Sequence, residues 1–123
     1  MNITYAITVC NEFVEIQRLM SFLLLHKRYQ DNIVVLYDEA NGDPEVEEYL
    51  RTHSLNGEFA WHKAKFQNHF AEWKNRLSSL CNGDYIFQID ADEVPHEKLI
   101  EVLPDVLEGN DVEVKRTLNV EFL

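Results

Sequence analysis

Three carboxylates lie within four positions just after an apolar run, where Asp90, Asp92 and Glu93 follow the segment IFQI. Alternate residues of an extended segment point to the same side, so Asp90 and Asp92 can face one site. Two carboxylates with no Cys or His beside them favour a hard divalent ion, Mg²⁺ or Mn²⁺, over zinc, and such ions complete their coordination with water and phosphate. The spacing predicts a site for a metal ion and a diphosphate; the alternative is a polar turn after a buried strand.

Polar residues also follow two other apolar runs. Asn11 and Glu12 come after the run at residues 3–9, and Asp38 and Glu39 close the run that begins at residue 32. In a parallel α/β sheet, ligands bind outside the carboxyl ends of the strands, near the point where the strand order reverses. We therefore expect all three polar clusters at the same edge of one sheet.

The elements that must position these residues alternate along the chain. Apolar periodicity predicts strands and helices in turn, although Pro104 must kink or end the last helix. This alternation is typical of an α/β domain with a mainly parallel sheet and helices on both of its faces, formed here by residues 1–123 as a single domain. The expected strands are 3–9, 32–38, 57–63, 85–90 and 112–123, and the expected helices are 12–26, 44–53, 68–81 and 96–109.

Composition excludes several classes of protein. The formal net charge of -11 makes a nucleic-acid backbone an unfavourable partner. No apolar run approaches the roughly 20 residues of a membrane span, and the N-terminus lacks the basic region of a signal peptide. Cys10 and Cys81 are expected to be reduced, small core residues. A cytoplasmic location fits these features.

Three segments together resemble the nucleotide-sugar half of the inverting glycosyltransferases of family 2, which have the GT-A fold. The segments are ITYAITVCNE, IVVLYDEANGD and FAEWKNRLSSLCNGDYIFQIDADEVP, and the resemblance covers essentially the whole chain. The third is the most specific, because it joins a basic-Asn pair, a Gly-Asp turn, a strand and an Asp-Ala-Asp-Glu sequence. The resemblance implies a Rossmann-like GT-A domain that binds a UDP-sugar together with Mn²⁺ or Mg²⁺.

The resemblance also implies a role for particular residues. Asp38 and Glu39 correspond to the acidic pair that reads uracil, and a carboxylate that accepts the N3–H of uracil would disfavour cytosine. Lys74 corresponds to the basic residue that faces the diphosphate, and Asp92 and Asp90 to the metal ligands. The full set of nucleotide-binding residues implied is Thr8, Val9, Asn11, Glu12, Asp38, Glu39, Lys74, Asp90, Ala91 and Asp92.

Two further expectations concern the helix that carries Lys74. Lys63, Lys65, Lys74 and Arg76 make the middle of the chain locally basic, and we expect only Lys74 to act on a diphosphate. Phe70 and Trp73 share the apolar face of the helix, so we interpret them as core residues rather than as platforms for a sugar ring.

The implied reaction transfers a sugar from UDP to a hydroxyl acceptor, a saccharide or another compound. A divalent ion would stabilise the departing diphosphate, and a carboxylate would deprotonate the acceptor. In the family that base lies beyond the strand after the Asp-x-Asp segment, a region that also binds the acceptor. This chain is unusually short and is expected to lack most of that region, which leaves Glu93, Glu97, Glu113 or a residue of a partner subunit as candidate bases.

Other functions stay open at this stage. The chain can be a nucleotide-sugar-binding module without transferase activity, or a UDP-sugar hydrolase. A nucleotidyltransferase is disfavoured because CNEFVE has no glycine, and a dehalogenase-type phosphatase because its Asp-x-Asp should follow the first strand. An open sheet edge and an apolar tail also predict a homo-oligomer. The tail residues are Val114, Leu118, Val120, Phe122 and Leu123.

Overall fold

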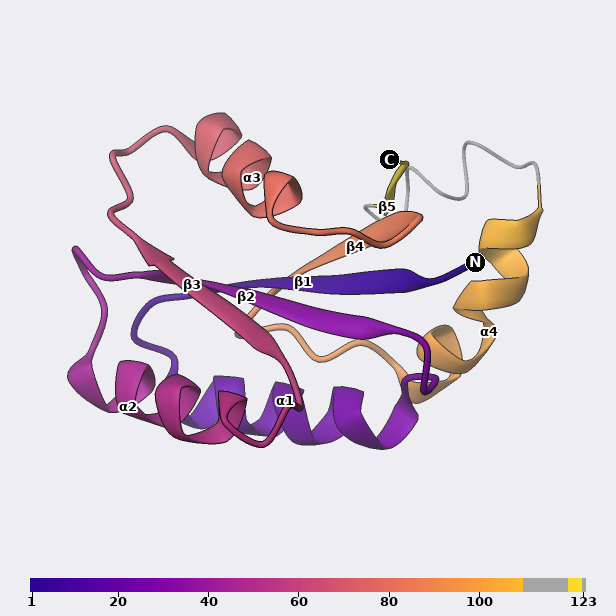
Figure 1. The fold of residues 1–123 in the computed structure, drawn as a ribbon, viewed down its shortest axis with the longest axis horizontal. Helices are drawn as coiled ribbons and strands as arrows, with labels where there is room; N and C mark the ends of the chain where they lie inside the picture. Colours follow the sequence, from indigo (N-terminus) through magenta and orange to yellow (C-terminus); the bar gives the residue numbers. More distant parts are fainter. Residues whose placement is uncertain (110–119, 123) are drawn as a thin grey trace.

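The structure, a computed structural model, describes residues 1–109 and the backbone of residues 120–122. Strands and helices alternate along the chain, as the apolar periodicity predicts (Figure 1). The elements are β1 (Ile3–Val9), α1 (Phe13–His26), β2 (Asn32–Asp38), α2 (Pro44–Ser54), β3 (Ala60–Ala64), α3 (Phe70–Ser79), β4 (Tyr85–Asp90), α4 (Glu97–Glu108) and β5 (Val120–Phe122).

One sheet organises the described chain, with its strands in the order β3-β2-β1-β4-β5. The pairs among β3, β2, β1 and β4 are parallel, and β5 pairs antiparallel with β4. The chain moves outward in one direction from β1 to β3 and then returns to the other side of β1 to form β4. The strand order therefore reverses between β1 and β4, and their register sets Thr8 beside Asp90. A reversal of this kind is where ligands bind in open α/β sheets.

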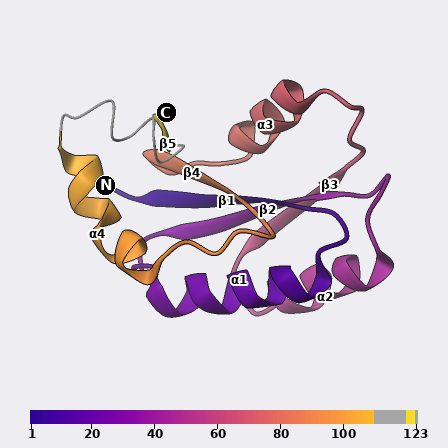
Figure 2. The ribbon, with the colours of Figure 1, turned by 180° about the vertical axis from the view of Figure 1, so that it is seen from behind.

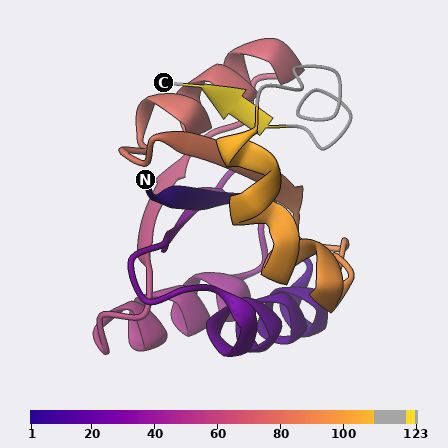
Figure 3. The same cartoon turned by 90° about the vertical axis from the view of Figure 1, so that its right-hand side faces the viewer.

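Helices cover both faces of the sheet, as predicted. Helices α1 and α2 lie below the sheet and α3 lies above it in Figure 1, and the reverse view agrees (Figure 2). The end-on view separates the two layers most clearly (Figure 3). The larger core joins one face of the sheet to apolar residues of α1, α2 and α4, and the smaller core packs Leu77 of α3 against Ala6, Val34 and Ile86.

Buried polar groups fix the amino ends of the central strands. Thr4 Oγ1 accepts a hydrogen bond from the Gly83 backbone N–H (2.9 Å) and donates one to Asn32 Oδ1 (2.6 Å). Asp31 accepts from the Ile3 backbone N–H (2.9 Å) and from the Arg28 guanidinium at 2.9 Å. These contacts tie β1 to both neighbouring strands at the edge opposite the predicted site.

The structure decides one alternative left open by the sequence and corrects one boundary. Helix α4 spans Glu97–Glu108, close to the expected 96–109, and Pro104 lies buried inside it without ending it. An interior proline costs about 3 kcal/mol, and the burial of Ile100, Leu103 and Leu107 against the sheet offsets this cost. Strand β3 begins at Ala60 instead of residue 57.

The expected last strand, residues 112–123, is described only as β5 (Val120–Phe122). Val114, Leu118 and Leu123, on which the expected apolar tail depends, lie outside the described residues. None of the helices in the described ranges has the length and apolar character that crossing a membrane requires.

Candidate functional site

A cavity of about 440 Å³ opens at the carboxyl ends of β1, β2 and β4, where the strand order reverses. It lies where the sequence predicts a ligand site, and it brings together residues that are up to about 80 positions apart in the chain. The residues that line it are Thr8, Val9, Cys10, Glu12, Asp38, Asn41, Phe66, Phe70, Trp73, Lys74, Asp90 and Asp92.

Asp90 is the centre of the polar contacts at one end of this cavity. Its Oδ1 accepts hydrogen bonds from Thr8 Oγ1 at 3.0 Å and from Lys74 Nζ at 3.2 Å. Its backbone N–H donates to Glu93 Oε1 at 2.9 Å, so the turn after β4 is held by the third acid of the cluster. Glu93 therefore shapes the turn, and it does not line the cavity.

Asp92 faces the same cavity without such partners. Its side chain is exposed, and it makes no hydrogen bond or ion pair with a described residue. Ala91 between the two acids is buried in the larger core, and its backbone N–H donates to the Thr8 carbonyl at 3.1 Å. The alternation expected for an extended segment is thus observed, with both carboxylates on the cavity side.

The donor set fits a hard divalent ion that shares its coordination sphere with phosphate. Two carboxylates, Asp90 and Asp92, supply hard oxygen donors, and Mg²⁺ or Mn²⁺ usually takes only one or two from a protein. No group of three or more His, Cys, Asp or Glu side chains in the described chain is arranged to hold a metal alone. A substrate that brings its own oxygen ligands would complete this donor set.

Asp38 lies at the other end of the cavity and is only 6% exposed. Its Oδ1 accepts from the backbone N–H groups of Ala40 and Phe66, both at 3.0 Å, and its Oδ2 accepts from Asn41 Nδ2 at 2.9 Å. Burial alone would raise the pKa of Asp38, but these hydrogen bonds outweigh it and lower the pKa below its usual value. Asp38 is therefore an ionised group that joins the loops after β2 and β3.

The thiol of Cys10 lies beside this carboxylate, with Sγ 3.8 Å from Asp38 Oδ2. Burial and the neighbouring acids raise the pKa of Cys10 to about 11, so the thiol stays protonated and is a weak donor. Cys10 and Cys81 form no disulfide within the described residues, and both are half-buried. Cys81 packs against the smaller core, whereas the position of Cys10 corrects the expectation that it is a core residue. Cys10 lines the cavity because it follows the last residue of β1.

Three aromatic residues, from α3 and the loop before it, form part of the cavity lining. The Phe66 ring lies 5.0 Å from that of Phe70 and 5.5 Å from that of Trp73, measured between ring centroids. Phe70 is 72% exposed, so the expectation that it is a core residue is wrong. It is the first residue of α3 and lines the cavity. Trp73 is half-buried and packs against the smaller core while it lines the cavity.

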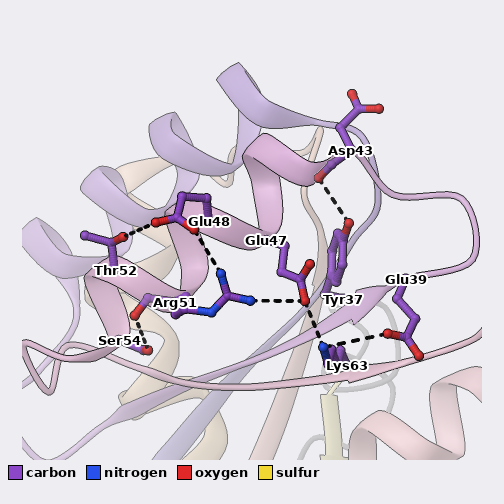
Figure 4. A network of polar contacts seen from close by, with 9 residues as sticks. All are labelled: Tyr37, Glu39, Asp43, Glu47, Glu48, Arg51, Thr52, Ser54 and Lys63. Carbon is purple, nitrogen blue, oxygen red and sulfur yellow. Dashed lines mark hydrogen bonds and ion pairs between the residues drawn. The ribbon is translucent and has the colours of Figure 1, made fainter.

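Lys74 is the positively charged residue of the cavity lining. The other basic residues of the middle segment do not line the cavity. Lys63 Nζ lies 3.0 Å from Glu47 Oε1 and 3.9 Å from Glu39 Oε2, within an ion-pair network on α2 and β3 (Figure 4). Glu39 belongs to this network and not to the cavity lining. The structure thus separates Asp38 from Glu39, although the two are adjacent in sequence.

The remaining predicted residues lie around the cavity. Glu12 lines it, and its Oε2 accepts from the backbone N–H groups of Cys10 (3.3 Å) and Asn11 (3.2 Å). Asn11 is exposed and is not part of the lining. Glu97 also lies outside it, with its carboxylate 3.8 Å from His26, and Glu113 is outside the described residues.

Sequence analysis missed Cys10, Asn41 and Phe66 as cavity residues and misplaced Phe70. Cys10 and Asn41 had a usable signal, because each directly follows or lies close to the carboxyl end of a predicted strand. Phe66 had none, since it lies in the loop before α3, where Asn68 has a positive φ of 63°.

Comparison with known proteins identifies the fold. No family model and no curated protein matches the sequence. Among solved structures, TarS of S. aureus (residues 1–349) has a TM-score of 0.68 at 10% identity, covering 88% of this chain and 32% of TarS. The mannosyltransferase PcManGT of Pyrobaculum calidifontis, solved with GDP-Man and Mn²⁺, has a TM-score of 0.70 at 15% identity, covering 89% of this chain and 33% of that one.

A further TarS structure, in complex with UDP, has a TM-score of 0.63 at 13% identity, covering 88% of this chain and 31% of that one. The chain spans about a third of the length of these structures. The similarity confirms the Rossmann-like, GT-A-like α/β fold that the sequence predicts.

Proposed function

We propose that this chain binds a UDP-sugar with Mn²⁺ or Mg²⁺ in the cavity and supplies the donor site of a glycosyltransferase of the family 2 type. The observation that carries the proposal is the convergence of Thr8, Lys74, Asp90 and Asp92 at the point where the strand order reverses. The neighbours support it, because PcManGT was solved with GDP-Man and Mn²⁺ and TarS with UDP and with UDP-GlcNAc.

In this proposal Asp92 and Asp90 hold the divalent ion. When bound, the ion supplies Lewis-acid stabilisation of the departing diphosphate. Lys74 adds a positive charge from α3, and the Thr8 hydroxyl keeps the Asp90 carboxylate oriented toward the cavity. The acceptor is a hydroxyl group of a saccharide or of another compound.

We assign recognition of the nucleobase to the other end of the cavity. Asp38 Oδ2 has one strong partner, Asn41, and one weak partner, the Cys10 thiol at 3.8 Å. The weakly used position beside Cys10 can accept the N3–H of uracil, whereas cytosine presents an unprotonated N3 there. Thr8, Val9 and Glu12, which line the cavity, complete the proposed nucleotide contacts. Asn11 and Ala91 lie outside the lining, and Glu39 would join only by leaving Lys63.

Calorimetric titration with UDP, CDP and GDP in the presence of Mn²⁺ tests this assignment. We expect UDP to bind most tightly and CDP clearly less tightly, because a lost hydrogen bond to a charged group costs about 1.5–3 kcal/mol. GDP belongs in the series because one neighbour was solved with GDP-Man. Equal affinity for all three nucleotides would remove the uracil role of Asp38.

A second function, donor binding without transfer or with hydrolysis, has its own support. The candidate bases Glu93 and Glu97 are engaged elsewhere, with the Asp90 backbone N–H and with His26. Product analysis distinguishes the functions. UDP released only with an acceptor indicates transfer, UDP released without one indicates hydrolysis, and binding without release indicates a module.

A further inference from the structure

We propose that Lys74 couples metal binding to diphosphate binding by exchanging partners: it occupies Asp90 in the absence of nucleotide and moves to the diphosphate when the nucleotide binds. The inference rests on the proposed function and adds to it a dependence of metal binding on nucleotide binding. The divalent ion alone binds weakly, and the diphosphate opens the site for it.

The contacts of Asp90 carry the first step. A carboxylate oxygen has two acceptor positions, and the partners of Asp90 Oδ1 are Thr8 Oγ1 at 3.0 Å and Lys74 Nζ at 3.2 Å. A divalent ion that approaches this oxygen must displace one of them. It also meets the repulsion of an ammonium group a few ångströms away, which is strongest at close range.

The mobility and surroundings of Lys74 carry the second step. Its side chain is 38% exposed, and its ammonium sits on a flexible four-carbon stem, so exchange between acceptors needs no backbone movement. Lys63, which among the described residues also forms ion pairs near this sheet edge, is held by Glu47 and Glu39. A diphosphate in the cavity therefore attracts the ammonium group of Lys74. This attraction draws the ammonium group away from Asp90.

The consequence is a positive coupling between the two ligands. Asp92, which has no partner among the described residues, offers the first carboxylate to the ion, and the departure of Lys74 opens a position on Asp90 Oδ1 while Thr8 stays in place. By thermodynamic reciprocity, the nucleotide must raise the affinity for the ion by the same factor as the ion raises the affinity for the nucleotide.

The experiment compares the parent with Lys74→Gln, and with Arg76→Gln as a matched loss of one positive charge. Arg76 is exposed on the same helix and does not line the cavity. Electron paramagnetic resonance measures the concentration of unbound Mn²⁺ during a titration. The titration is done first without nucleotide and then with saturating UDP. Circular dichroism verifies that each variant is folded.

We expect Lys74→Gln to bind Mn²⁺ alone about tenfold more tightly than the parent, because the repelling ammonium is gone. UDP alone should bind this variant more weakly, and the UDP-induced gain in Mn²⁺ affinity should shrink by a similar factor. Arg76→Gln should behave like the parent in all three measurements.

If Lys74→Gln binds Mn²⁺ alone no more tightly than Arg76→Gln, the exchange is overturned, even where UDP binding is intact. If neither variant nor the parent binds UDP, the proposed function itself fails and the exchange fails with it. The Mn²⁺ titration therefore tests the exchange, and the UDP titration tests the proposed function.

Discussion

At the scale of single residues, the site depends on how carboxylates with similar sequence surroundings are used differently. Asp92 is exposed and has no partner among the described residues, Asp90 is shared between Thr8 and Lys74, and Asp38 is buried under several donors. The sequence places all three at carboxyl ends of strands but contains no sign of these differences. They arise from loops, because the donors to Asp38 come from residues 40, 41 and 66.

Asp38→Asn should change how stability depends on pH. The pKa of Asp38 is lowered in the folded chain, so its stabilisation is present above the unfolded value of about 3.9 and is lost as the pH falls through the lower folded value. The free energy of unfolding of the variant should be about 1–3 kcal/mol lower at neutral pH, the cost of leaving buried donors unsatisfied. It should also decrease less steeply as the pH falls.

Urea unfolding at a series of pH values measures both effects. Asp105→Asn, which removes an exposed carboxylate on α4, is the control for the loss of one acidic group. An acid slope that is the same in Asp38→Asn and in the parent would refute the role of Asp38 as an ionised link between the loops.

At the scale of elements, periodicity predicts the buried strands and misses residues that are exposed at the sheet edge or at the cavity. The runs at residues 3–9 and 32–38 coincide with β1 and β2 because both strands are almost fully buried and therefore almost fully apolar. Strand β3 lies at the edge with mostly exposed residues, so its apolar pattern is weak and does not define its start at Ala60. Phe70 continues the apolar face of α3 in sequence but is exposed at the cavity.

Gly83→Ala should weaken the pairing that sets Thr8 beside Asp90. A Cβ at Gly83 would lie 2.6 Å from Thr4 Oγ1 and 2.7 Å from the Thr4 backbone nitrogen, so β1 or β4 must shift. We expect a loss of about 1–3 kcal/mol in the free energy of unfolding, the usual cost of overpacking.

Thermal and urea unfolding measure this loss. Gly109→Ala is the matched control, because its Cβ would approach no closer than 3.3 Å to the Val106 carbonyl oxygen and should cost less. Equal stability of the parent and Gly83→Ala would contradict the close approach of β1 to this turn.

At the scale of the whole molecule, the alternation of strands and helices predicts the α/β class, and the fold confirms it. Local sequence patterns do not predict the order of the strands in the sheet, because this order depends on which side of β1 the chain returns to. The reversal between β1 and β4 nevertheless has a cavity at the carboxyl ends of the strands, where the sequence predicts a ligand site, because that prediction depends only on parallel strands that end at one edge.

Self-association is the prediction that belongs to this scale. Strands β3 and β5 are the outer strands of the described sheet, and each pairs with one neighbour there. Unpaired edges favour contact with another chain. Light scattering across a concentration series should show a homo-oligomer, and deletion of residues 118–123 should weaken it. A parent that stays monomeric at the highest concentration would exclude this assembly.

The affinity for UDP with and without Mn²⁺ tests the central claim most directly. For the parent, calorimetry should show UDP binding at least about tenfold tighter with Mn²⁺, because each contact to a charged group contributes about 1.5–3 kcal/mol. Asp92→Asn should abolish this difference, and Asp90→Asn should reduce it. If Mn²⁺ leaves the affinity of the parent for UDP unchanged, or if both variants match the parent, then Asp90 and Asp92 form only a polar turn.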